Sequence, residues 1–136
     1  MNKIFVLAIA VILVLIIMAG CGSSASSVPV SSLSVEMSEF RFDPADMTII
    51  AGKEITLSLK NTGGVDHEFT ILRKGVVVKI PFDPEQQGKD ILAQFKIGAK
   101  QSGEFTFTLP EAGEYQVICS IQGHMEAGML AKLIAK

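Results

Sequence analysis

Residues 115–129 read Tyr115-Gln-Val-Ile-Cys119-Ser-Ile-Gln-Gly-His124-Met-Glu-Ala-Gly-Met129, and this stretch decides the fold that we expect. It places a thiol, an imidazole and a thioether five residues apart, at Cys119, His124 and Met129. The spacing is too irregular for one strand and too long for one helical face, so the chain must form a loop here. Such a loop wraps the three side chains around a common point, and a metal ion is the natural occupant.

The donor atoms narrow the choice of metal. Thiolate and thioether are soft ligands and imidazole is intermediate, and two His, one Cys and a weak axial Met are the set that holds copper in electron-transfer sites. The chain has 2 histidines in all, and the second is His67. With His67 the set is complete and neither histidine is left over. The alternative for His67 is a hydrogen-bonded histidine of the core.

Alternating apolar and polar residues from Val35 onward are typical of half-buried strands. Turn signals separate about eight such runs, residues 76–80 being one of them, with no amphipathic helix between them. The alternation slips at Glu39, which indicates a bulge or a bend. We therefore expect an all-β chain that forms an antiparallel Greek-key β-sandwich.

The phase of the alternation also predicts where the candidate ligands point. His67 lies in phase with Phe69, whose side chain is expected in the core. Cys119 continues the inward face of the strand before it, and Met129 begins a strand with its side chain turned inward. His124 lies within the loop, so it is the ligand that we expect near the surface.

Four short motifs carry a resemblance to a known family: Gly113-Glu-Tyr-Gln-Val-Ile-Cys119, Gly123-His124, Gly128-Met129 and, upstream, Asp66-His67-Glu68-Phe69. From about Val35 to the C-terminus the chain resembles the type 1 (blue) copper proteins, the cupredoxins, and is most similar to the plastocyanin and auracyanin group. The spacing of the Cys, His and Met residues is the most specific part of this likeness.

The resemblance implies one copper ion, with His67, Cys119 and His124 in a trigonal plane and Met129 as the long axial ligand. It implies an electron carrier that cycles between Cu(II) and Cu(I), with a redox-protein donor and acceptor in a membrane electron-transport chain. The ring edge of His124 would face these partners. Ile121 and Met125 are candidates for an apolar collar around it, and ordinary loop packing is the alternative.

Two positions depart from the pattern of many relatives. Glu68 stands where Asn is usual after the first histidine, and Gln122 stands where Pro is usual before the loop Gly-His. The reduction potential of a relative therefore does not transfer to this chain. Asp66, Glu68 and Glu126 place carboxylates near the ligands, where they are either ordinary solvated charges or groups that steer a basic partner.

The N-terminus has the layout of a secretory signal: Lys3, an apolar run over residues 4–19, and a small-residue boundary at Gly20-Cys21. Met18-Ala-Gly-Cys21 resembles a bacterial lipoprotein cleavage box, so we expect residues 1–20 to be removed and Cys21 to be acylated. An uncleaved anchor helix is the alternative. Residues 22–33 form a Ser-rich linker and residues 34–136 the cupredoxin domain. Either outcome tethers the domain to the extracytoplasmic (periplasmic or extracellular) face of the cell membrane.

Composition and histidine count limit the other functions. The net charge is −2 and the charges are interspersed, so the sequence lacks the cluster of basic residues that is typical of nucleic-acid-binding proteins. A copper oxidase or reductase needs an open coordination position or a second copper, and no histidine is spare. We therefore expect no enzyme, and a monomer. The alternatives are an extracytoplasmic copper carrier or sensor without an electron-transfer role, and a metal-free interaction domain with a buried thiol at Cys119.

Overall fold

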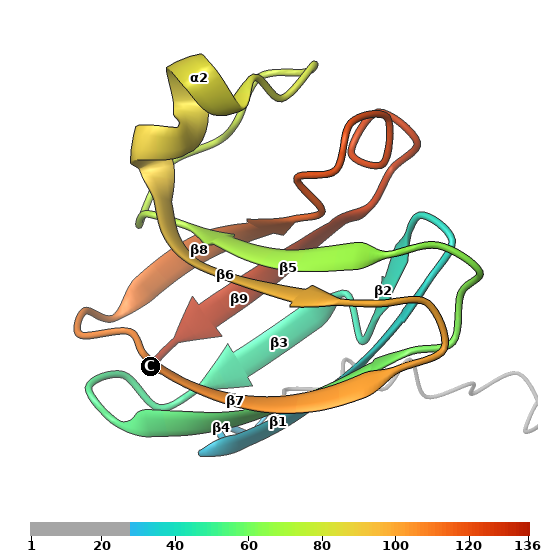
Figure 1. Ribbon diagram of the computed structural model, residues 1–136. Coiled ribbons are helices and arrows are strands. Elements are labelled where there is room, and N and C mark those ends of the chain that lie inside the picture. Colours follow the sequence, from blue (N-terminus) through green and yellow to red (C-terminus); the bar gives the residue numbers. More distant parts are fainter. Residues whose placement is uncertain (1–27) are drawn as a thin grey trace, which may run out of the picture.

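The computed structural model describes residues 28–136 and places them in two facing sheets (Figure 1). Over this range the strands are β1 (Ser32–Ser38), β2 (Arg41–Asp43), β3 (Asp46–Ile49), β4 (Glu54–Asn61), β5 (His67–Leu72), β6 (Ile91–Ile97), β7 (Ser102–Thr108), β8 (Gly113–Ile118) and β9 (Leu130–Ala135). The short helix α2 (Pro84–Gln87) and the 3-10 turn η1 (Gly88–Asp90) lie between β5 and β6.

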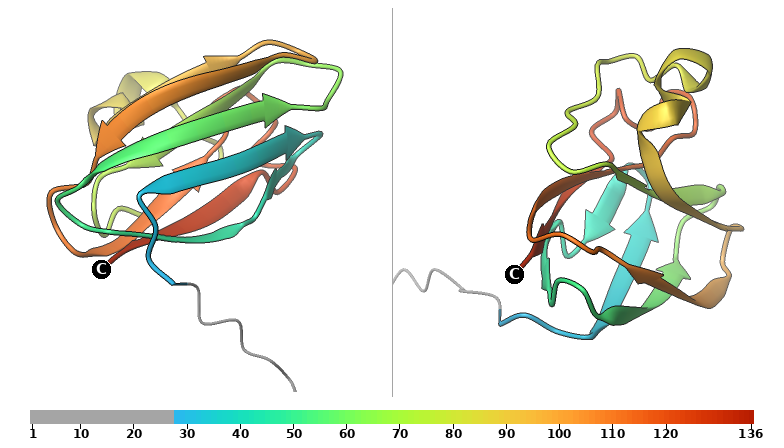
Figure 2. Two further views of the ribbon diagram at one scale, coloured as in Figure 1. Left: turned by 90° about the horizontal axis from the view of Figure 1, so that it is seen from below. Right: turned by 90° about the vertical axis from the view of Figure 1, so that its left-hand side faces the viewer.

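The predicted β-sandwich is confirmed, and the pairing of its strands differs in one respect. One sheet has the order β2-β1-β4-β7 and the other the order β3-β9-β8-β5-β6, and Figure 2 shows them from two further sides. Most neighbours are antiparallel, but β1 runs parallel to β4 and β3 runs parallel to β9. Alternation predicts which face of a strand is buried and carries no information on the direction of its neighbour, so the sequence did not reveal these parallel pairs.

The core between the sheets forms where the alternation predicted it. In β4 the inward side chains Ile55, Leu57 and Leu59 are at most 1% exposed, and the residues between them reach solvent in part. We call the large apolar cluster between the sheets the main core; it includes Phe69, Cys119 and Met129. Two of the four candidate ligands therefore belong to the core itself.

Residues 76–80 do not form the predicted strand. They lie in a segment that we call the excursion, residues 73–90, which stands out from the sandwich beyond β8 and β6 (Figure 1). Val77 in this run is 78% exposed. Instead of pairing with a strand, the run turns Val76 and Val78 toward a second apolar cluster on the outer face of the five-stranded sheet.

The excursion covers part of the outer face of the five-stranded sheet. Beneath it a second apolar group, which we call the outer cluster, consists of Leu72, Phe82, Ile118 and Met125. Leu72 and Ile118 are the strand residues whose side chains point away from the main core. The sandwich thus has two apolar layers on the two sides of β5 and β8.

The break in the apolar-polar alternation at Glu39 corresponds to a tight hairpin between β1 and β2. Ser38 pairs with Arg41, so Glu39 and Phe40 form the loop. Beyond the loop Phe42 is 1% exposed, while Phe40 is 42% exposed. The bend was therefore predicted correctly, and Phe40 lies outside the core.

The N-terminal predictions fall mainly outside the described residues. The signal peptide, Cys21 and the first half of the Ser-rich linker precede residue 28. The first strand begins at Ser32, two residues before the expected start of the domain, and Val30 already forms a bridge to Ile49. Within residues 28–136 no helix has the length and apolar character needed to cross a bilayer.

Candidate metal centre

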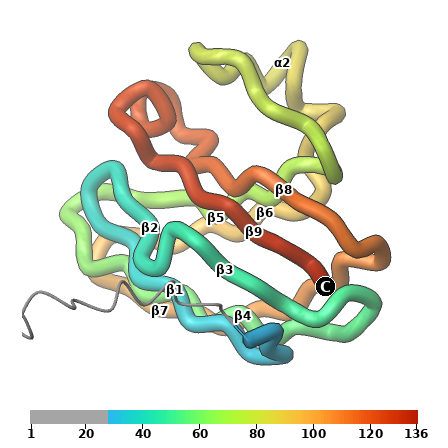
Figure 3. The backbone as a smooth tube through the Cα atoms, turned by 180° about the vertical axis from the view of Figure 1, so that it is seen from behind, coloured from blue at the N-terminus to red at the C-terminus, as the bar shows by residue number. Residues whose placement is uncertain are grey.

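The four candidate ligands come from three segments that meet at one end of the sandwich. His67 is the first residue of β5, Cys119 directly follows β8, and Met129 directly precedes β9. We call residues 119–129, which include His124, the ligand loop. Figure 3 shows it in orange-red beside the hairpin between β1 and β2 and the turn that leads into β5.

Three donor atoms converge at this end. The Nδ1 atoms of His67 and His124 are 3.2 Å apart, and the Sγ atom of Cys119 is 3.3 Å from Nδ1 of His124. All three donor atoms lie within 4.8 Å of one another, and these residues form the one such group of His, Cys, Asp and Glu found in the described part of the chain. Metal bonds of about 2.0–2.3 Å to nitrogen and sulfur bring donors to separations of this size, so the set fits a metal ion.

Burial follows the prediction for each ligand. His67, Cys119 and Met129 are 0% exposed, and His124 is partly exposed. The backbone closes the ligand loop around them: the N–H of Cys119 donates to the carbonyl of Met129 at 3.1 Å, and the N–H of Met129 donates to the carbonyl of His124 at 3.0 Å. Met129 is thereby tied to both neighbouring ligands and buried in the same core as Cys119.

Burial also sets the protonation of the two fully buried groups. It lowers the pKa of His67, and the neighbouring His124 lowers that pKa further, against the opposite effect of Glu39 and Asp66. Burial raises the pKa of Cys119, although backbone N–H groups of Glu68 and Ile121 favour the thiolate. The metal-free site therefore holds a neutral imidazole ready to bind and a thiol whose proton a cation must displace.

The turn before β5 is held by Asn61, the last residue of β4. Its side-chain amide donates to the carbonyls of Val65 at 2.8 Å and Gly98 at 3.1 Å, and its carbonyl oxygen accepts from the N–H of Gly63 at 2.9 Å. A Cβ at Gly63 would lie only 3.0 Å from Nε2 of His67. The turn therefore packs its backbone directly against the buried imidazole and fixes its position.

The Glu68 position departs from the family pattern and is not a free carboxylate. Its backbone N–H donates to Sγ of Cys119 at 3.4 Å, and its carboxylate accepts from the hydroxyl of Ser120 at 2.5 Å and from the amide of Gln94 at 2.9 Å. Thr70 is 2.7 Å from the same hydroxyl. Glu68 thus connects the segment of His67 to the segment of Cys119.

The other two carboxylates differ from each other. Asp66 forms an ion pair with Lys96 at 3.0 Å and accepts from the N–H of Ala99 at 3.2 Å, so it belongs to the fold of this end. Glu126 is exposed at the far side of the ligand loop. Both carboxylates are exposed and so match the picture of a solvated charge, and Asp66 in addition forms this surface ion pair.

The predicted apolar collar is only partly right. Ile121 is partly exposed and packs against the main core, whereas Met125 is 1% exposed and belongs to the outer cluster. For Met125 the alternative, loop packing, is the one that the structure supports, because the ligand loop turns this side chain under the excursion. The exposed apolar residues at this end are Phe40 and Val65, which the sequence analysis did not propose.

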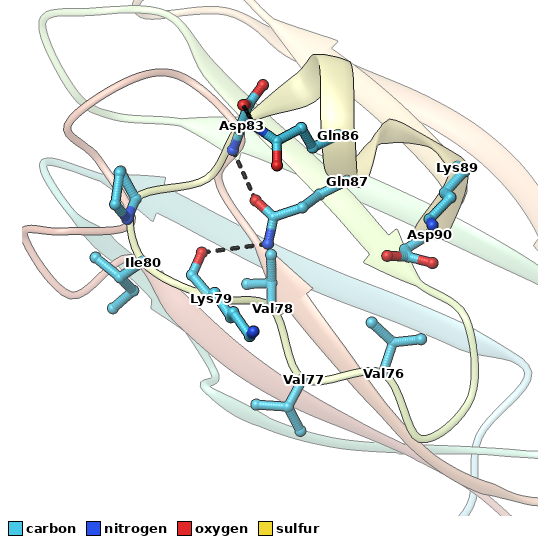
Figure 4. Close-up of a pocket in the computed structure, with 11 residues that line it drawn as sticks. Val76, Val77, Val78, Lys79, Ile80, Asp83, Gln86, Gln87, Lys89 and Asp90 are labelled. Carbon is cyan, nitrogen blue, oxygen red and sulfur yellow. Dashed lines mark hydrogen bonds between the residues drawn. The ribbon is translucent and has the colours of Figure 1, made fainter.

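A separate hollow lies on the excursion. It has a volume of about 530 Å³ and is lined by residues 76–81, 83, 86, 87, 89 and 90. Figure 4 shows how the side-chain amide of Gln87 spans it: the amide oxygen accepts from the N–H of Asp83 at 2.7 Å, and its nitrogen donates to the carbonyl of Lys79 at 3.4 Å. None of the four candidate ligands lines this hollow.

Two imidazole nitrogens and a buried thiol gathered at one end of a β-sandwich define a candidate metal site with the donor set of copper proteins. The chain belongs to the cupredoxin family, because the family profile described as "Cupredoxin-like domain" matches residues 8–134. Members of this family bind copper.

Known proteins support the same family and differ in their descriptions. The chain is 33% identical over 100 residues to the copper-resistant cuproprotein CopI of Rubrivivax gelatinosus and 28% identical over 100 residues to auracyanin-A of Chloroflexus aurantiacus. These matches cover 71% and 63% of this chain but only 60% and 62% of those two proteins. The crystal structure of reduced auracyanin from Roseiflexus castenholzii matches with a TM-score of 0.66 at 22% identity, over 80% of this chain and 99% of that chain, which shows the shared fold.

Proposed function

We propose that the chain is a blue copper protein that carries single electrons, holding one copper ion between His67, Cys119, His124 and Met129. The observation that carries this proposal is the convergence of two Nδ1 atoms and one Sγ atom within 4.8 Å. A bound copper supplies the one-electron couple Cu(II)/Cu(I). The chain contributes a fixed set of donors, so little has to rearrange when an electron enters or leaves.

Each ligand has a defined task in this proposal. Burial keeps the His67 imidazole neutral and therefore available as a donor. Cys119 loses its proton to the solvent on metal binding, and the N–H of Glu68 stabilises the resulting thiolate. Met129, buried and tied to both loop ligands, is the weak axial donor. His124 is the partly exposed ligand through which an electron reaches a redox partner.

The runner-up is copper handling without electron transfer. It is favoured by the likeness to CopI, which is described as a copper-resistant cuproprotein. Auracyanin A, described as a "blue" copper protein, supports the electron carrier instead, and its structure matches with a TM-score of 0.62. The burial of three of the four donors favours the carrier, because a protein that must release copper benefits from exposed and adaptable ligands.

Spectroscopy and voltammetry separate the two functions. We expect the domain from residue 22 onward, loaded with Cu(II), to bind one copper, to show an intense thiolate-to-copper absorption band and to undergo reversible one-electron redox. A colourless and weakly held Cu(II) would instead support copper handling. A strain that lacks the gene gives the biological counterpart: lowered copper tolerance with unchanged electron transport would point to the CopI-like role.

We propose an electron carrier and not an enzyme. Both histidines of the chain are used in the single donor cluster of residues 28–136, so a second copper has no histidine ligand there. The proposed partners are therefore a protein donor and a protein acceptor, each meeting a monomeric domain at the His124 end. Stopped-flow oxidation of the reduced protein by membrane fractions would identify them by rate.

We further propose that the domain works on the extracytoplasmic face of the membrane, tethered through its N-terminus. The support is the leader sequence and the cleavage-box likeness at Cys21, both of which precede the described residues. Cys21→Ser should release the protein from the membrane fraction if Cys21 is acylated. A Cys21→Ser protein that stays membrane-bound would indicate an uncleaved anchor helix.

A further inference from the structure

The hairpin loop of Glu39 and Phe40, which we call the tip, contacts the ring of His124 and the backbone of the turn before His67. The rings of Phe40 and His124 pack in a T-shaped arrangement, with centroids 5.2 Å apart and an interplanar angle of 83°. The carboxylate of Glu39 accepts from the N–H of Gly64, in the turn that leads to His67. The tip is thus connected to both histidine-bearing segments, although it contributes no ligand.

The backbone at Phe40 is unusual for a bulky residue. Its φ of 58° lies in the left-handed region, where the second position of a two-residue hairpin loop normally takes glycine. Non-glycine residues keep such a conformation where the surrounding structure enforces it, and they cluster at functional sites. The aromatic side chain is therefore retained at a cost to the backbone, and its one ring contact in the described structure is to His124.

We propose that Phe40 is a positioning residue: the tip presses its ring against His124, holds that imidazole in its ligating orientation and keeps small external ligands from the metal. The part that concerns the metal rests on the proposed function; the part that concerns the imidazole does not. His124 needs such support because it is the one histidine of the site that is partly exposed, and it lies in a loop rather than on a strand. His67, by contrast, is held by β5 and by the backbone at Gly63.

Phe40→Gly is the informative variant because it removes the ring and also relieves the left-handed backbone. We expect its thermal stability to stay the same or rise, while the site loosens. Phe40→Tyr keeps the ring and should behave as the unmodified protein. Lys100→Gly is the comparison for the backbone effect, since Lys100 also has a positive φ, 61°, and makes no ring contact with His124. Its side chain donates to the carbonyl of Thr62, in the turn before His67, so the readout that distinguishes the two variants is the ring of His124.

Two measurements test the two parts separately. In the copper-free protein, NMR should show a broadened His124 ring signal that samples more than one orientation in Phe40→Gly only. In the Cu(II) protein, azide should perturb the absorption band of Phe40→Gly at about threefold to tenfold lower concentration, the scale of one lost aromatic contact. An equally ordered His124 ring in Phe40→Gly, or an equal response to azide, would overturn the proposal. Failure of the unmodified protein to bind copper would overturn the proposed function and leave the NMR result standing.

Discussion

The main core and the outer cluster are built in different ways, although the same strands β5 and β8 separate them. The main core comes from alternating residues of paired strands, and its members are held from both sheets. The outer cluster joins two outward-facing strand residues to Phe82 of the excursion and Met125 of the ligand loop. One layer is therefore fixed by the sheets, and the other depends on two loops that pack on each other.

The ligand loop belongs to both layers. Cys119 and Met129, where the loop begins and ends, lie in the main core, whereas Met125 in the middle lies in the outer cluster. The difference indicates a division of labour: the main core fixes where the sulfur ligands are, and the outer cluster fixes the course of the loop that carries His124. Substitutions in the two layers should therefore separate these two tasks.

The largest effect on the copper site is expected at Cys119, the thiol that the main core supplies as a ligand. Cys119→Ser should remove the intense visible band completely, because the thiolate is its source, while the copper-free fold persists. Cys21→Ser is the matched control and should keep the band at full strength. A blue band in Cys119→Ser, recorded by absorption spectroscopy at equal copper content, would contradict the assignment of Cys119.

A pair of phenylalanines compares the two layers directly. Phe107 in the main core and Phe82 in the outer cluster are 8% and 9% exposed. Phe107→Ala should lower the free energy of unfolding by about 3–5 kcal/mol, because the sheets on both sides keep the cavity open. Phe82→Ala should cost only about 1.5–3 kcal/mol, the transfer term alone, since the excursion can collapse.

The order of the two variants should be reversed for the rate at which copper is released. Phe82→Ala removes a packing partner of Met125, so copper should leave this variant faster than it leaves Phe107→Ala. Urea titration of the copper-free proteins gives the stabilities, and copper transfer to a chelator gives the rates. Equal release rates would show that the outer cluster does not support the ligand loop.

The pH dependence of the copper-free protein reports on the buried imidazole. Because burial lowers the pKa of His67 in the folded state, the unfolded chain binds this proton more readily below its ordinary pKa of about 6.5. Stability should therefore fall as the pH drops from about 6.5 toward 5, with a slope of at most about 1.4 kcal/mol per pH unit from this group. His67→Gln should flatten this part of the unfolding profile measured by denaturant titration. An unchanged slope would show that a group other than His67 causes the pH dependence of the stability.

The sequence predicted the parts of the molecule that alternation controls. The inward direction of His67, Cys119 and Met129 follows from the phase of their strands, and the structure buries all three completely. The sandwich was predicted for the same reason. The parallel pairing of β1 with β4 could not be predicted. Alternation shows which face of the sheet a side chain points to, and this does not depend on the direction of the neighbouring strand.

The errors concern residues whose environment is made by distant loops. For Met125 the sequence left an exposed collar and loop packing both open, because nothing local reveals the excursion that covers it. Residues 76–80 looked like a strand because the run is apolar, whereas in the structure Val76 and Val78 pack on the outer cluster. Phe40 left one signal, the slip of the alternation at Glu39, but its contact with His124 spans most of the domain. Such contacts are properties of the tertiary fold and not of a sequence window.

The smallest expected effect separates two buried methionines that differ only in the layer they occupy. Met129→Leu should keep the blue band and raise the reduction potential, because losing a weak thioether donor destabilises Cu(II) more than Cu(I). Each tenfold change in the relative affinity for the two oxidation states corresponds to about 59 mV for one electron. Met125→Leu is the matched substitution in the outer cluster, where no donor is lost, so its potential in cyclic voltammetry should stay at the unmodified value. If Met129→Leu lost copper altogether, Met129 would be a strong ligand and not a weak axial one. If both variants shifted the potential equally, the effect would come from packing of the ligand loop, and the division between the two layers would fail.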